Sequence, residues 1–163
     1  MFGAYLKKIV MLYPSLEILP FETQSPHPDI IAARLESLYK LTNADNNIII
    51  TVPSAVMQRV MPKDALLSSL QKVEVGEELN RDEFLKKLMN MGYSRTALVE
   101  DRGDVRIAGG IIDIFPPIYS SPIRLEFFGD EIESIRQFDI ATQRSNKEIH
   151  EITIMPAIEN EAE

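Results

Sequence analysis

The chain has 163 residues, of which 45% are hydrophobic and 26% charged, and this is enough for one full domain or for one domain and part of another. It has no cysteine, which excludes disulfides, thiolate chemistry and zinc sites of the cysteine type. The formal net charge of -8 argues against a large phosphate-binding surface, because nucleic-acid affinity depends mainly on clustered lysine and arginine.

No run of about 18 apolar residues indicates a membrane span. The first ten residues place their lysines after the apolar side chains and lack the order of a secretory signal. We therefore expect a cytoplasmic protein.

The first elements in chain order are a short helix at 2–10 and a short strand at 16–19. Prolines and a capping side chain within 25–29 then mark the start of a helix. Apolar residues at helical spacing continue it to about Leu41.

A continuous β-branched run at 47–52 predicts a strand that is buried on both faces and ends at Pro53. Two short helices are expected next, at 54–60 and 62–69. This alternation of strand and helix is typical of an α/β domain, and we place its end near residue 70.

The second half begins with a predicted strand at 71–75. Asn80, with Glu83 three residues later, resembles a capping box at the start of a helix over 81–91. Gly92 lies where a left-handed C-cap is expected.

Residues 94–154 show period-two patterns and turn residues without further helical periodicity. They predict an antiparallel sheet packed on the preceding helix, so the fold class is α+β overall. The acidic end, 159–163, is expected to be frayed.

Catalytic signatures are missing from the pattern. None of the seven glycines lies in the setting of a phosphate-binding loop. His27 and His150 have no histidine or cysteine partner at metal-ligand spacing. The acidic cluster at 130–133 falls in a predicted hairpin, which favours solvated turn residues over acid–base chemistry. We predict no catalytic, cofactor-binding or metal-binding residue, and a stand-alone enzyme is not expected.

The segment 123–128 has two chemically different sides. One side carries Ile123, Leu125 and Phe127, and the other carries Arg124, Glu126 and Phe128. Arginine and aromatic side chains are common among the hot spots of protein interfaces. The pair Gly129-Asp130 predicts a two-residue hairpin turn. Two interpretations stay open: a docking surface, or a face on which Phe128 packs against a neighbouring element and Arg124 pairs with Glu126.

Three stretches are distinctive: PSAVMQRV at 53–60, GGIIDIFP at 109–116, and RLEFFGDEIESIR at 124–136. They closely resemble the N-terminal, UvrB-like region of the bacterial transcription-repair coupling factors (Mfd), and the resemblance extends over nearly the whole chain. UvrB, the excision-repair helicase subunit, is similar in the second half. Its tyrosine-rich hairpin has no counterpart here, so the coupling factors are the better match.

The resemblance implies that residues 71–154 form a UvrB-like domain, similar to UvrB domain 2, that binds the damage-recognition ATPase UvrA. The implied contact residues are Arg124, Glu126 and Phe128. The family commonly has an arginine where this chain has Ala108. Arg106, two residues earlier, shares that side of the strand and is a further candidate.

The resemblance also implies that residues 1–70 are part of a helicase-like α/β domain that lacks nucleotide-binding motifs, and that 155–163 is a tail. The parent protein would be an ATP-dependent DNA translocase that reaches DNA and RNA polymerase through its other domains. Because the sheet of the first half looks truncated, we expect self-association or disorder within residues 1–50.

The leading hypothesis is a noncatalytic adaptor that recruits UvrA to stalled transcription sites and needs no cofactor. The alternative is a DNA-handling fragment of a helicase-type translocase, in which Arg59, Arg95 and Arg102 contact DNA.

Overall fold

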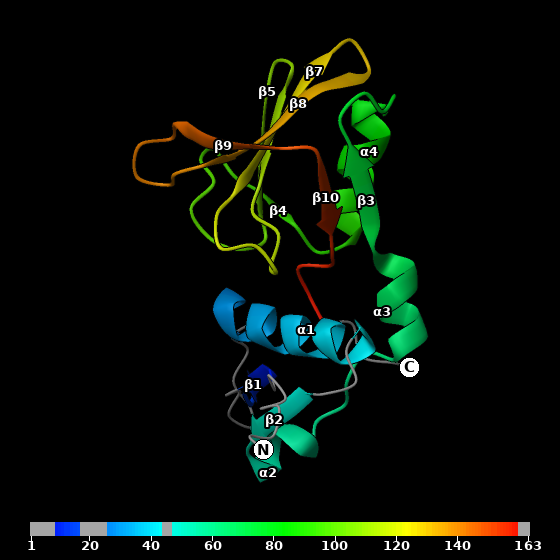
Figure 1. The fold of residues 1–163 in the computed structure, drawn as a ribbon, viewed down its shortest axis with the longest axis vertical. Helices are drawn as coiled ribbons and strands as arrows, with labels where there is room; N and C mark the ends of the chain where they lie inside the picture. The colour runs from blue at the N-terminus through cyan, green and yellow to red at the C-terminus, as the bar shows by residue number, and fades with distance from the viewer. Residues whose placement is uncertain (1–8, 17–25, 44–46, 160–163) are drawn as a thin grey trace, which may run out of the picture.

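Strands and helices alternate in the first half of the chain, and antiparallel sheet dominates the second half (Figure 1). A computed structural model describes residues 9–16, 26–43 and 47–159. The elements in chain order are β1 (Ile9–Tyr13), α1 (Pro28–Asn43), β2 (Asn47–Thr51), α2 (Pro53–Val56), α3 (Lys63–Ser69), β3 (Gln71–Glu74), α4 (Arg81–Asn90), β4 (Ser94–Arg95), β5 (Asp104–Ala108), β6 (Ile111–Ile114), β7 (Ile123–Phe128), β8 (Glu131–Phe138), β9 (Ser145–Ile149) and β10 (Glu151–Ile154). The class is mixed α+β.

The sheet of the first half consists of β1 and β2, which pair in parallel and lie against α1 (Figure 1). Met11 and Tyr13 of β1 are buried, whereas Leu12 between them is exposed. Ile48 and Ile50 of β2 are exposed as well. The prediction that this strand is buried on both faces is therefore wrong, because the sheet formed by the described residues has only two strands.

Three predictions fall wholly or partly outside the described residues. Of the helix expected at 2–10, only the last two residues are described, and they begin β1 because pairing with β2 overrides local preference. The strand expected at 16–19 lies outside the description except for Leu16, which is in no element. The third prediction is self-association or disorder within residues 1–50. The described part of that range includes β1, α1 and most of β2.

Helix α1 confirms the helix predicted to end near Leu41. The helix predicted over 54–60 is shorter, since α2 ends at Val56 and the following chain turns away. In that turn the Gln58 side chain accepts hydrogen bonds from the Leu16 backbone N–H and from Arg34. Helix α3 and strand β3 lie where the sequence predicts them, and Pro62 is the N-cap of α3.

Helix α4 confirms its predicted caps. The Asn80 side chain accepts hydrogen bonds from the backbone N–H groups of Asp82 and Glu83, both at 3.1 Å. Gly92 has a φ of +87°, in the left-handed region. A Cβ at this glycine would lie 2.5 Å from the Ile158 side chain, so the position requires glycine for two reasons.

The second half is a six-stranded sheet in the order β4-β5-β6-β7-β8-β9, antiparallel except for the short β4–β5 pair. One face packs on α4, and the core residues that join them include Phe84, Leu88, Ile112, Leu125 and Ile135. Gly129 and Asp130 form the predicted two-residue turn between β7 and β8. The turn alone does not fix the whole register, because a bulge shifts it between Glu126 and Phe127.

The end of the described chain returns to the first half. Strand β10 pairs with β3, and Met155 is then fully buried in a cluster with Leu35 and Leu66. Glu159 forms an ion pair with the buried Arg34. The expected tail is therefore packed as far as residue 159, because it has both an apolar and a charged partner. Residues 160–163 lie outside the description.

Among the described residues, no helix is both long and apolar enough to cross a membrane.

Candidate functional site

The face of the six-stranded sheet that points away from α4 carries charged side chains in register. Strand pairing places Arg106 of β5 beside Asp113 of β6, Asp113 beside Arg124 of β7, and Arg124 beside Arg136 of β8. Directly paired residues of antiparallel strands point to the same side. We call this side the outer face, defined by Arg106, Asp113, Arg124, Glu126, Phe128, Ser134 and Arg136.

Asp113 is the centre of the first contact network on the outer face. Arg124 binds its carboxylate with two donors, Nε to Oδ1 at 2.6 Å and Nη2 to Oδ2 at 3.0 Å. Arg106 Nη1 donates to Oδ2 at 3.1 Å. The Asp113 side chain is only 1% exposed, because the two longer side chains cover it. The hydrogen bond to Asp113 raises the pKa of Arg124, so this guanidinium stays charged.

Further contacts hold Arg124 on its other sides. Its Nη1 donates to the Gln143 carbonyl oxygen at 3.3 Å, and its guanidinium carbon lies 4.8 Å from the centre of the Phe138 ring. The Arg124 side chain is nevertheless 16% exposed. The interpretation that Arg124 pairs with Glu126 is wrong, since its ion pair is with Asp113.

A second network orients Glu126. Ser134 Oγ donates to Glu126 Oε2 at 2.7 Å, and Arg136 Nη1 lies 3.4 Å from the same oxygen. The carboxylate is partly exposed, and its position is set by two neighbours from the next strand. It therefore presents a fixed acceptor beside the guanidinium of Arg124.

Phe128 ends β7 and is 79% exposed, so it does not pack against a neighbouring element in this structure. It lies beside the β7–β8 turn, where it pairs with Glu131. An exposed aromatic side chain next to fixed charges is a combination found at the centres of protein interfaces.

Two arginines lie near Ala108, the last residue of β5. Arg106 lies on the same side of β5, as alternation predicts. Arg81, at the start of α4, donates to the carbonyl oxygen of Gly109 at 3.1 Å. The structure thus brings a second guanidinium to the β5–β6 turn that sequence reasoning missed.

Sequence reasoning also missed Asp113, Ser134 and Arg136 as parts of the outer face. Alternation within 111–114 was a usable signal for Asp113, since Ile112 and Ile114 point into the core. Arg136 had no comparable signal, because its place opposite Arg124 depends on the bulge in the β7–β8 pairing.

The arginines of the DNA-handling alternative are not gathered into one surface. Arg59 follows α2 and Arg95 lies in β4, in different halves of the molecule (Figure 1). Arg102 is engaged, since its Nη1 lies 2.6 Å from Asp29 Oδ1 and its guanidinium stacks on Phe115.

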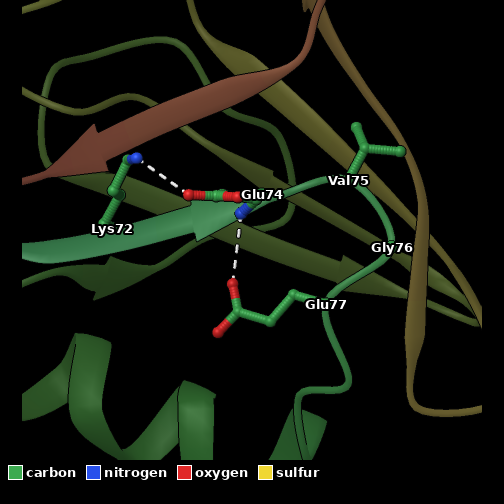
Figure 2. A pocket seen from close by; sticks show the side chains of 5 residues that line it. All are labelled: Lys72, Glu74, Val75, Gly76 and Glu77. Carbon is green, nitrogen blue, oxygen red and sulfur yellow. Dashed lines mark hydrogen bonds and ion pairs between the residues drawn. The ribbon is translucent and has the colours of Figure 1, made fainter.

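A hollow of about 440 Å³ lies beside β3, and Figure 2 shows its lining. Lys72 points to Glu74 there, at 2.8 Å, and also reaches Glu151 at 2.7 Å. Hydrogen bonds to these carboxylates, first to Glu151 and then to Glu74, raise the pKa of Lys72. The lysine is thus held as a cation and is a poor candidate for a base or nucleophile. Within the described residues, no cluster of histidine, aspartate and glutamate is suited to hold a metal ion.

Comparison with known proteins identifies relatives of both halves. Residues 71–159 match the UvrB interaction domain. The chain is 39% identical over 150 residues to the transcription-repair-coupling factor of Haemophilus influenzae, and 36% identical to those of Myxococcus xanthus and Escherichia coli. These matches cover 92–96% of this chain and 13–14% of the relatives. They confirm the resemblance to coupling factors inferred from the sequence.

Proposed function

Since this chain belongs to the UvrB interaction domain family, we propose that it is the noncatalytic, UvrA-binding region of a transcription-repair coupling factor. Within the whole protein, an ATP-dependent DNA translocase in this proposal, the region recruits UvrA to stalled transcription sites. Residues 71–154 form the UvrA-binding domain, similar to UvrB domain 2. Residues 1–70 are part of a helicase-like domain and have the remaining domains of the coupling factor as partners.

We assign UvrA binding to the outer face, with Arg124, Glu126, Phe128 and Arg106 as contact residues. The observation that supports this best is Phe128, a large apolar side chain that is 79% exposed on the same side of β7 as Arg124 and Glu126, whose side chains are held in place by neighbours. An aromatic anchor needs an apolar pocket in the partner, and the charges around it select the orientation.

The proposal is tested by measuring the affinity of purified UvrA for this chain and for Phe128→Ala. Truncation of a hot-spot residue costs about 2 kcal/mol, so we expect roughly 30-fold weaker binding. Met57→Ala is the matched control, because Met57 is an apolar side chain of similar exposure, 86%, in the other half of the chain. We expect it to bind within about twofold of the wild type.

Arg124→Glu is a second test variant, which reverses a charge on the outer face. It places a carboxylate beside Asp113, and circular dichroism must show that the variant is folded before its affinity is read. Arg59→Glu, at an exposed position in the other half, makes the same charge change as a control. If Phe128→Ala binds UvrA as tightly as the wild-type chain does, the proposed surface is wrong.

A further inference from the structure

We propose that Asp113 is a positioning residue of the outer face: it does not contact the partner but holds Arg124 and Arg106 in the arrangement that binds. This inference rests on the proposed function, because it concerns the same surface. Asp113 lies in the middle of β6, paired with Arg106 on one side and with Arg124 on the other.

The burial of Asp113 argues for an indirect role. At 1% exposure its carboxylate offers almost no surface to a partner protein. Its carboxylate accepts hydrogen bonds from the two arginines, at 2.6, 3.0 and 3.1 Å. A partner that approaches the outer face therefore meets the guanidinium groups rather than the carboxylate below them.

The geometry of the Arg124 contact limits the motion of that side chain. Two parallel donors on one carboxylate define both the position and the plane of the guanidinium. The Phe138 ring and the Gln143 carbonyl oxygen hold the remaining sides. A free arginine loses considerable rotamer freedom when it binds, and a fixed one has lost that freedom before the partner arrives.

The charges of the cluster indicate the chemistry of its partner. Arg106 and Arg124 share the single carboxylate of Asp113. The three side chains therefore carry a net positive charge, which the two partly exposed arginines present at the surface. Glu126 forms its ion pair with Arg136 and a hydrogen bond with Ser134, and not an ion pair with Arg106 or Arg124. The complementary surface on UvrA is therefore expected to present a carboxylate opposite Arg124.

The test is a double-mutant cycle on UvrA affinity with Asp113→Asn and Arg124→Ala. Asparagine keeps the shape but offers one acceptor oxygen in place of two. We expect Asp113→Asn to weaken binding about tenfold, which corresponds to about 1.4 kcal/mol. In the Arg124→Ala background the same change should alter the affinity by less than about threefold, because only the contact of Asp113 with Arg106 remains to be lost.

A purely structural role predicts a different pattern. Ile112→Val is the matched control, since it lies in the same strand, points into the core and tests loss of packing without touching the outer face. We expect it to leave UvrA affinity unchanged. Equal effects of Asp113→Asn in both backgrounds would show that Asp113 acts through the fold and would overturn the inference.

Arg124→Lys keeps the inference testable if Asp113→Asn does not fold. Lysine retains the charge but cannot form the two-donor contact. We expect it to bind UvrA nearly as weakly as Arg124→Ala, and wild-type affinity would overturn the positioning role. If the wild-type chain itself fails to bind UvrA, the proposed function fails together with this inference.

Discussion

Removing the carboxylate of Glu159 should destabilise the chain strongly, although this residue is close to the C-terminal end. Its carboxylate binds Arg34 through two contacts, 2.6 Å to Nε and 3.2 Å to Nη2. The side chains are 0% and 5% exposed, so the pair is shielded from water. Glu159→Ala leaves a buried cation without its counter-charge.

The expected magnitude follows from what remains around Arg34. Loss of one partner from a buried ion pair costs about 3–5 kcal/mol. The carbonyl oxygen of Pro14 and the amide oxygen of Gln58 still accept hydrogen bonds from Nη1 at 2.9 Å, and the Tyr13 ring still lies 4.4 Å away. We therefore expect the low end, about 3 kcal/mol. Glu159→Gln, which keeps one acceptor, should cost less, about 1–2 kcal/mol.

Urea unfolding followed by circular dichroism measures this change. With a slope of about 1–3 kcal/mol per molar urea, the midpoint should fall by at least about 1 M. Glu36→Ala is the control, because Glu36 lies on α1, the helix that carries Arg34, and pairs with Lys40 at the surface. Loss of that surface pair should cost under about 0.5 kcal/mol. A change for Glu159→Ala no larger than that of the control would refute the reasoning.

Two further predictions concern stability. Gly92→Ala should lower the free energy of unfolding by about 1–3 kcal/mol, measured by urea unfolding, because it combines a φ of +87° with a clash against Ile158. This cost should be smaller in an Ile158→Ala background. An unchanged cost in that background would show that the clash is unimportant. Burial raises the pKa of Tyr13 to about 12 and raises the pKa of Tyr93 and Tyr119 above the ordinary value of 10.0. Since the folded chain holds these protons more tightly, stability should be constant below about pH 10 and fall as the pH rises from there towards 12. Thermal unfolding between pH 7 and 11.5 checks this, and a melting temperature that stays constant above pH 10 would contradict it.

Features with a local cause could be predicted from the sequence. The start of α4 depends on Asn80 and its end on Gly92, both within one turn of the helix. The two sides of β7 follow from alternation, and the β7–β8 turn from Gly129 and Asp130. These preferences act over a few residues, so a single sequence contains the information that they need.

Features with a distant cause could not be predicted. The pattern of β2 is that of a strand buried on both faces, but burial depends on how many strands and helices surround it. Alternation put Arg124 on the outer face without identifying Asp113 as its partner, because the β6–β7 register is set by core packing on the opposite side. The packing of Met155 and Glu159 depends on α1, more than 100 residues earlier.

The pairing of β3 with β10 has a mechanical consequence. Gln71 pairs with Ile154 and Glu74 with Glu151, so the chain leaves for the six-stranded sheet and comes back from it through two adjacent strands (Figure 1). Residues 75–150 are thus joined to the first half by a two-stranded ladder of four residue pairs, and also by the ion pair between Arg102 and Asp29 of α1. A force on the outer face would therefore reach α1 by two routes, the β3–β10 ladder and the contact of Arg102 with Asp29, so weakening one of them leaves the other.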